Sequence, residues 1–382
     1  MPLDTALPQD WRAGHFALRI QGQEGPQAIA LARGEAYDMT PAFGTVSAWL
    51  NDGAPLAAIA AHGVKVTLDI PALVAAGDRL LAPFDLQALK ACGVTYVRSM
   101  LERVIEERCR GDATQAEAIR AEVRGIIGDD LANLRPGSPE AATLKRNLVE
   151  RGWWSQYLEV GIGPDAEVFT KGQPLSAVGS GAKIGVHPGS AWNNPEPEVV
   201  LAVDAQGRIL GAALGNDVNL RDVEGRSALL LGKAKDNNAA CAIGPAIRLF
   251  DETFTMEDIR QSETILTIEG TDGFRLRESG KVGAISRDPT DLVAQMIGPH
   301  HQYPDGAALF LGTPFSPSQD RGAPGMGFTH KPGDVVHIAS EKLGALCNTV
   351  ERTDLCPPWR FGIGALMANL RARGLPRATP PA

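Results

Sequence analysis

The fold and the chemistry of this chain both depend on the stretch Glu196-Pro197-Glu198-Val199-Val200-Leu201-Ala202-Val203. The five residues after Glu198 are all apolar, which predicts a buried β-strand. Side chains two positions apart share one face of a strand. We therefore expect the carboxylates of Glu196 and Glu198 to point into one cavity.

A third acid follows nineteen positions after Glu198, because Asp217 lies in the stretch Gly215-Asn216-Asp217-Val218-Asn219-Leu220-Arg221-Asp222. Three carboxylates with no neighbouring Cys or His favour magnesium, manganese or calcium over zinc. They leave about three of six octahedral positions open for substrate and water. The alternative is that these acids are surface residues at turns, since Asn, Asp and Pro are common turn formers.

The same region resembles the fumarylacetoacetate hydrolase family. The resemblance runs from about Leu80 to Val350, and its motifs are Glu167-Val168-Phe169-Thr170-Lys171, Asn216-Asp217-Val218-Asn219-Leu220-Arg221-Asp222, Lys233-Ala234-Lys235, Cys241-Ala242-Ile243-Gly244-Pro245 and Lys331-Pro332-Gly333-Asp334. It implies an α+β fold whose catalytic domain is a mixed β-roll or β-sandwich. It also implies that Glu196, Glu198 and Asp217 bind Mg²⁺, with Mn²⁺ as the alternative ion.

The chain is long enough for one large domain and a smaller one. We expect a small N-terminal domain over residues 1–79 and a catalytic domain over residues 80–382. Helical patterns over about 98–151 indicate a helical insertion in the catalytic domain, with a role as a lid or a subunit contact. A further helix is expected near 233–250.

Charge argues against a nucleic-acid partner, because the net charge is −8 and the pI is near 5.5. The most basic stretch, residues 102–124, alternates Arg with Glu at helical spacing, which predicts a solvated helix face.

The five cysteines are far apart and form no Cys-x-x-Cys pair, which fits a reducing cytoplasm. We find neither an export signal nor an apolar run long enough to span a membrane, so no membrane partner is expected. We also expect a homodimer or a homotetramer.

Two residues are candidates for proton transfer. The resemblance implies that Lys235 is the catalytic lysine, by its place in Lys-Ala-Lys; the alternative is a structural salt bridge to Asp236 or to a metal ligand. Glu167 is the second candidate acid or base, and its alternative is a turn acid before a strand.

The chain departs from the hydrolases of this family at Ser99, where they carry a histidine that activates water. Without that base, hydrolysis of a carbon–carbon bond lacks its water activator, whereas elimination needs none. The chain thus resembles the branch of the family that dehydrates 2-keto-3-deoxy sugar acids. The expected reaction converts a 2-keto-3-deoxy pentonate (xylonate or arabinonate) to 2,5-dioxopentanoate. The alternatives are hydrolysis of 2,4-diketo acids or acylpyruvates, and an inactive metal-binding scaffold.

Six further residues are candidates for contact with a small-molecule 2-keto-3-deoxy sugar acid, namely Ser99, Arg98, Thr313, Lys171, Arg221 and His301. Thr313 has a turn cap as its alternative role, and Arg221 has a pairing with Asp222. Adjacent side chains on a strand point to opposite faces, so at most one of His300 and His301 reaches a given site.

Overall fold

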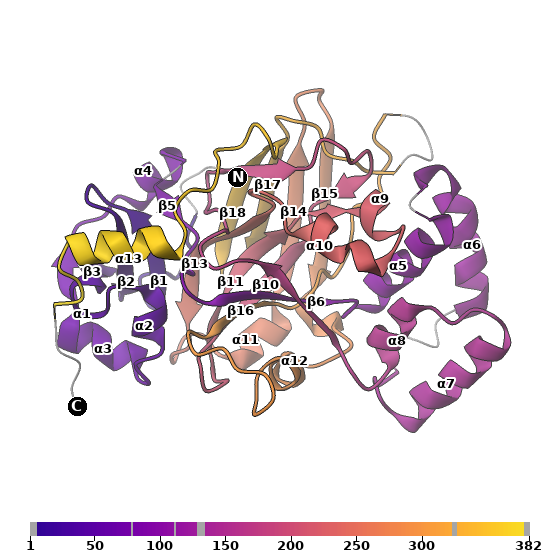
Figure 1. Ribbon diagram of the computed structural model, residues 1–382, viewed down its shortest axis with the longest axis horizontal. Helices are drawn as coiled ribbons and strands as arrows, with labels where there is room; N and C mark the ends of the chain where they lie inside the picture. Colours follow the sequence, from indigo (N-terminus) through magenta and orange to yellow (C-terminus); the bar gives the residue numbers. More distant parts are fainter. Residues whose placement is uncertain (1–5, 78, 111, 128–133, 323–326, 378–382) are drawn as a thin grey trace.

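The structure is a computed structural model of the chain, and it describes residues 6–77, 79–110, 112–127, 134–322 and 327–377. A large β-sheet runs through its centre (Figure 1). Its strands are β1 (His15–Gln21), β2 (Pro26–Ala32), β3 (Glu35–Asp38), β4 (Val64–Val66), β5 (Leu80–Leu81), β6 (Ala88–Gly93), β7 (Glu167–Gly172), β10 (Pro197–Val203), β11 (Ile209–Asp217), β13 (Cys241–Leu249) and β16 (Ala307–Phe310). They follow the order β4-β3-β2-β1-β13-β11-β10-β16-β6-β7, and β5 pairs with β1.

A second, smaller sheet packs against the large one. Its strands are β8 (Lys183–Val186), β14 (Glu263–Glu269), β15 (Arg275–Lys281), β17 (Val335–Ser340) and β18 (Gly344–Arg352), in the order β15-β14-β17-β18-β8. A two-stranded ribbon pairs β9 (Asn193–Asn194) with β12 (Asn219–Leu220). The packed sheets and the surrounding helices confirm the predicted α+β class.

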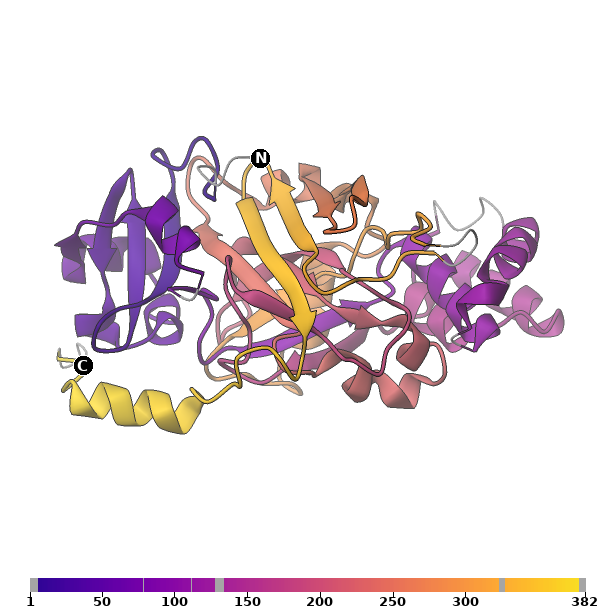
Figure 2. The same cartoon turned by 90° about the horizontal axis from the view of Figure 1, so that it is seen from above.

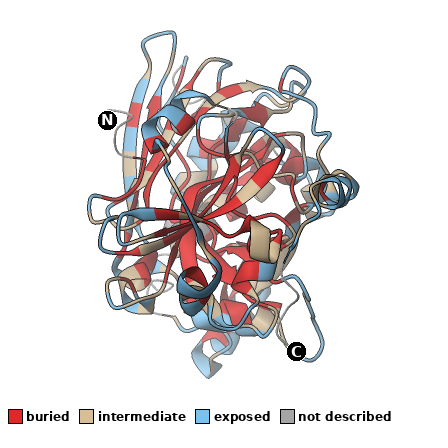
Figure 3. Ribbon diagram, turned by 90° about the vertical axis from the view of Figure 1, so that its left-hand side faces the viewer, coloured by how far each residue is buried: buried red, intermediate tan, exposed pale blue. Residues whose placement is uncertain are grey.

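The predicted strand after Glu198 is β10, and it is buried on both faces. Val199, Leu201 and Val203 belong to the apolar core shared with the small sheet. Val200 and Ala202 face a second core under the N-terminal helices. Burial on both faces explains the continuous apolar run, since a one-sided strand would alternate with polar residues. Figure 3 shows this burial along the central strands.

The N-terminal strands continue the large sheet, because Phe16 and Ala17 of β1 pair with Arg248 and Ile247 of β13. Helix α13 (Ile363–Ala372) lies beside this part of the molecule (Figure 2) and is attached to it by hydrogen bonds. The Asn369 side chain donates to the Glu24 carbonyl at 2.7 Å. The predicted boundary at residue 79 therefore falls within one continuous sheet, and two separate domains stay a prediction. The short helices here are α1 (Thr40–Phe43), α2 (Val46–Leu50), α3 (Pro55–His62) and α4 (Ile70–Ala75).

Helices occupy the region of the predicted insertion and gather at one end of the molecule (Figure 1). They are α5 (Val97–Cys109), α6 (Ala116–Ile127), α7 (Pro139–Glu150) and α8 (Gln156–Ile162). Ser138 is the N-cap residue of α7, and its hydroxyl accepts a hydrogen bond from the Ala141 amide at 3.1 Å. A separate apolar cluster that includes Val104, Leu148 and Leu158 holds these helices together.

The predicted helix over 233–250 was wrong. Helix α10 (Leu231–Lys235) ends at Lys235, and the following apolar run forms β13, whose nine residues are all buried. A short apolar run has no periodicity that separates a buried strand from a buried helix. Gly244 and Pro245 both disfavour a helix interior.

The remaining helices are α9 (Arg221–Glu224), α11 (Met256–Gln261) and α12 (Pro289–Met296). Across the described ranges, each helix is too short or too polar to cross a membrane.

A buried ion-pair network surrounds Asp334, in the turn before β17. Its carboxylate accepts hydrogen bonds from Arg321 Nη1 at 2.5 Å, from Arg321 Nη2 at 2.8 Å and from the Lys331 amide at 2.9 Å. Burial raises the pKa of Asp334, but the hydrogen bonds from Arg321 and His330 outweigh it and lower the pKa to about 2. A depressed carboxyl pKa stabilises the fold above the ordinary value of 3.8, and this stabilisation is lost as the pH falls through about 2.

Asp334→Asn is expected to lower the free energy of unfolding at pH 7 by at least about 2 kcal/mol, because it leaves the buried Arg321 guanidinium without its buried anion. Urea denaturation of the two proteins measures the difference. The difference in the free energy of unfolding between the wild type and Asp334→Asn should become smaller as the pH falls from 4 towards 2. Equal stability at pH 7 would contradict a stabilising role for this network.

Candidate active site

Three buried carboxylates meet where β10 and β11 lie side by side. Glu196, Glu198 and Asp217 each place one oxygen within 4.8 Å of the others, and each is at most 2% exposed. The strand register explains the meeting, because Pro197 pairs with Asn216 and the Asp217 amide donates to the Glu196 carbonyl at 3.0 Å. The prediction that Glu196 and Glu198 share one cavity is confirmed.

The Lys235 ammonium lies directly on this cluster. At the end of α10, its Nζ donates to Glu196 and, at 3.1 Å, to Asp217 Oδ2. A second lysine supports it, because Lys171 Nζ lies 3.3 Å from Asp217 Oδ1 and donates to the Lys235 carbonyl. The predicted alternative of a salt bridge to a metal ligand therefore describes how Lys235 is held in the structure.

Glu167 begins β7 and lines the same cavity. It lies opposite Gly93 of β6. A Cβ at position 93 would lie 1.9 Å from Glu167 Oε2, so only glycine leaves room for this carboxyl group. The structure thus brings both proton-transfer candidates, Glu167 and Lys235, to the carboxylate cluster.

An unpredicted arginine also reaches the cluster. Arg103 of α5 donates to Glu196 Oε1 at 2.5 Å and to Glu106 Oε2 at 2.7 Å, and its Nη1 lies 2.9 Å from Glu224 Oε2. The prediction of a solvated face over residues 102–124 was therefore wrong for the first turns of α5, where Arg103 and Glu106 are buried. The i,i+3 spacing of Arg103 and Glu106 could be read from the sequence. The sequence did not show that this face of the helix is turned towards the carboxylate cluster.

Burial and crowding of like charges shift the titration of these groups. Burial, then the charges of Asp217 and Glu196, raise the pKa of Glu198 well above its ordinary value. Burial raises the pKa of Glu224 to about 7 and also raises the pKa of Glu167. Burial lowers the pKa of Lys235, but its carboxylate neighbours outweigh this and raise it.

The lining of the cavity is acidic overall and tightly packed. Among the residues that the structure describes, it contains five carboxyl groups and two basic side chains, Arg103 and Lys235. Its volume is about 20 Å³, which is room for one water-sized species. Thr313 also lines the cavity, and its hydroxyl donates to the Phe315 carbonyl at 2.7 Å in the manner of a turn cap, so its contact with substrate stays a prediction.

The donor set fits a hard divalent cation. All three ligands are carboxylates, and Asp217 Oδ1 is a buried oxygen that accepts no hydrogen bond within the described ranges, although the Lys171 ammonium lies 3.3 Å from it. Lys171 and Lys235 compensate part of the negative charge of the cluster, and a cation at the three carboxylates would add to this compensation. Glu196, Glu198 and Asp217 would hold the ion.

Two predicted substrate contacts lie elsewhere. Arg221 pairs with Glu106 at 2.7 Å and with Glu102 at 3.0 Å, while Asp222 accepts a hydrogen bond from Ser190, so the predicted pairing of Arg221 with Asp222 was wrong. His301 is exposed and lines a separate pocket with Lys90 and Tyr303, because the loop before β16 turns away from the cluster.

Of the three other candidates for substrate contact, the structure describes the side chain of one. Lys171 is fully buried behind Asp217 and does not line the cavity. Arg98 and Ser99 belong to the first turn of α5, but their side chains lie outside what the structure describes.

Comparison with known proteins identifies the family. The sequence profile described as the C-terminal part of fumarylacetoacetate (FAA) hydrolase matches residues 159–351, which is half of the chain and contains the whole carboxylate cluster. The chain belongs to the fumarylacetoacetate hydrolase family.

Two curated proteins that are named as dehydratases are similar to this chain. A "probable 2-keto-3-deoxyxylonate dehydratase" of Haloferax volcanii is 32% identical over 194 residues, which are 51% of this chain and 63% of the relative. A "2-dehydro-3-deoxy-D-arabinonate dehydratase" of Saccharolobus solfataricus is 30% identical over 196 residues, which are 49% of this chain and 59% of the relative. The match thus spans less than two thirds of either relative.

Solved structures extend the likeness of fold. A 2-keto-3-deoxy-D-arabinonate dehydratase complexed with magnesium and 2,5-dioxopentanoate superposes with a TM-score of 0.60 at 21% identity, covering 88% of this chain and 99% of that one. The fumarylacetoacetate hydrolase fold therefore extends well beyond the residues that the family profile matches.

Proposed function

We propose that this chain is a magnesium-dependent dehydratase, a hydro-lyase, that converts a 2-keto-3-deoxy pentonate (xylonate or arabinonate) to 2,5-dioxopentanoate. The observation that carries the proposal is the buried triad Glu196, Glu198 and Asp217 with Lys235 and Glu167 on the same small cavity. The names of the two curated relatives support the substrate class.

The reaction removes one proton from C3 and the hydroxyl group from C4, which leaves water and a C3–C4 double bond. Loss of a C5 proton and protonation of C3 then give the C4–C5 enol. Protonation of C4 and loss of the enol hydroxyl proton give the aldehyde at C5. A divalent cation held by the triad would supply an electron-withdrawing charge at the C2 ketone, which makes the C3 protons more acidic.

The chain's own residues divide the remaining work. Glu167 is a carboxyl group whose burial raises its pKa, which favours the protonated form that can donate a proton. The Lys235 ammonium stabilises negative charge on the substrate oxygen or carries the proton itself. A five-carbon acid does not fit in about 20 Å³, so substrate binding must displace some of the lining side chains. Arg103 is a lining side chain that belongs to α5, in the helical region at one end of the molecule.

The direct test is incubation of the full chain with magnesium and 2-keto-3-deoxy-D-xylonate or D-arabinonate. We expect an aldehyde that an aldehyde dehydrogenase oxidises to 2-oxoglutarate, with no pyruvate. Pyruvate would indicate carbon–carbon cleavage instead. Metal binding without turnover of either sugar acid would favour an inactive scaffold. Light scattering on the same sample tests the predicted homodimer or homotetramer.

The runner-up function, hydrolysis of acylpyruvates, gives a separate prediction. Because Ser99 stands where the hydrolases carry their histidine, cleavage of acetylpyruvate should be slower than in a histidine-bearing hydrolase of the family by at least about 10²-fold, the usual effect of a general base. Loss of the diketone absorbance measures it at saturating magnesium. Cleavage as fast as dehydration would contradict the elimination mechanism and favour the hydrolase.

A further inference from the structure

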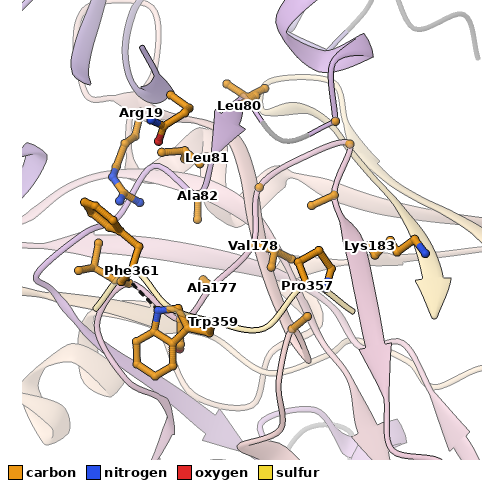
Figure 4. Close-up of a pocket in the computed structure, with 18 of the residues that line it drawn as sticks. Arg19, Leu80, Leu81, Ala82, Ala177, Val178, Lys183, Pro357, Trp359 and Phe361 are labelled. Carbon is orange, nitrogen blue, oxygen red and sulfur yellow. Dashed lines mark hydrogen bonds between the residues drawn. The ribbon is translucent and has the colours of Figure 1, made fainter. Parts of the chain in front are cut away.

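The protein has a second cavity, which is much larger than the cavity at the carboxylate cluster. Its volume is about 580 Å³, within the usual range for pockets that bind small organic molecules. Its walls come mainly from the β1 and β5 strands, residues 175–183, residues 238–239 and the C-terminal stretch 357–361 (Figure 4). It shares no lining residue with the candidate active site.

Arg19 of β1 is the unusual group in this cavity. It is only 5% exposed, and within the described part of the chain its guanidinium forms no ion pair and donates no side-chain hydrogen bond. In Figure 4 the guanidinium extends from its strand towards the side of the cavity where Ala82 and Phe361 lie. Its nitrogen atoms are not completely enclosed, so the five N–H donors of the guanidinium are open to an acceptor that enters the cavity.

The acid whose charge acts on Arg19 does not satisfy it. Asp85 accepts hydrogen bonds from the backbone amides of Val46, Ser47 and Leu86, at 2.7, 2.9 and 2.8 Å. No Asp or Glu occurs among the described residues that line the cavity. The positive charge of Arg19 is therefore available to an anion that enters.

The other residues that line the cavity indicate which kind of group the rest of the anion must be. Its walls are mainly apolar and include the rings of Trp359 and Phe361 and the proline Pro357 (Figure 4). Planar aromatic side chains pack well against a flat apolar group. Lys183, at the rim, is already paired with Glu351 at 3.0 Å.

Two wall residues also hold a backbone conformation that is uncommon for residues with a side chain. Leu175 and Ala239 have φ angles of 69° and 57°. Such conformations occur preferentially at functional sites, where the surrounding structure maintains them.

We propose that this cavity is a binding site for an organic carboxylate with a flat apolar body, and that Arg19 binds the carboxylate. The site is separate from the proposed dehydratase centre. Its ligand is chemically different from a polyhydroxylated sugar acid, because the walls offer apolar surface where such an acid needs hydrogen-bond partners.

The test uses 1-naphthoate as the probe and the neutral 1-naphthamide as its matched control, titrated into the full chain by calorimetry. Naphthoate should bind the wild type, and Arg19→Met should weaken its binding at least about 10-fold, since a charge-assisted hydrogen-bonded pair is lost. Arg277→Met, which removes an exposed arginine on β15, should leave the affinity unchanged. The neutral 1-naphthamide should bind weakly, and with equal affinity, to the wild type and to Arg19→Met.

Thermal unfolding shows that the variant is folded. Because Arg19 is a buried charge that has no partner among the described residues, Arg19→Met should unfold at the same temperature as the wild type or higher. Glu198→Gln, which alters the metal site, should bind naphthoate as the wild type does, so this test succeeds or fails independently of the proposed function.

Three outcomes would overturn the proposal. They are absence of naphthoate binding to the wild type, equal naphthoate affinity in Arg19→Met, and equal affinity for naphthamide and naphthoate. A wild-type dimer that dissociates in Arg19→Met would also overturn it, and would assign the cavity to a contact with a second copy of the chain.

Discussion

Lys235→Met should slow the dehydration of 2-keto-3-deoxy pentonate by about 10² to 10⁴-fold, the range expected when a proton-transfer group is removed. Methionine keeps most of the buried volume, and the bond from Lys171 to the position 235 carbonyl does not need the side chain. Exchange of the C3 protons for deuterium, followed by NMR, measures the step directly. We expect it to slow together with turnover.

Magnesium binding distinguishes this role from a structural one. The Lys235 ammonium lies 3.1 Å from Asp217 Oδ2, so its charge competes with a cation at the same carboxylates. Its removal should leave magnesium affinity equal or higher. Lys233→Met is the matched control, because Lys233 is exposed on the same helix. Unchanged C3 exchange in Lys235→Met would exclude Lys235 from proton transfer and enolate stabilisation.

Glu198→Gln should weaken magnesium binding by more than about 100-fold, because the loss of groups that merely orient a ligand already weakens metal binding 10 to 100-fold. The amide is nearly isosteric, and its oxygen can still accept the hydrogen bond from the Gly312 amide, which is 2.7 Å long. The fold should therefore survive. Calorimetric titration with magnesium chloride gives the affinity.

Glu224→Gln is the control for this experiment. It makes the same change in the same cavity, but Glu224 lies outside the cluster of three candidate ligands. Its effect on magnesium affinity should be several-fold at most. If Glu198→Gln binds magnesium like the wild type, or if Glu224→Gln loses as much affinity, the proposed ligand set is wrong.

The central strand and the carboxylate triad could be predicted because their information is local. Glu196 and Glu198 are two positions apart on an extended chain, so the period of a strand places them on one side of it. Asp217 and Lys235 were predicted from motifs that resemble those of the family. The structure brings all four together around one cavity.

Local patterns failed where two kinds of structure share one pattern. The apolar run of β13 was predicted to be a helix, because apolar burial on all sides looks the same in both. The alternation of Arg and Glu in α5 predicted a solvated face, because the same pairs stabilise an exposed helix.

Only the tertiary structure decided which distant groups meet. Arg103 contacts Glu196 across 93 positions of sequence, and Arg221 contacts Glu106 across 115. Sequence periodicity reports on neighbours two to four residues away, so it determined the strand, its acids and their shared face. Contacts such as those of Arg103, and the position of Arg19 on the wall of a cavity, depend on the path of the whole chain. That path is set by how the two sheets and the helical end pack together, and no local spacing encodes it.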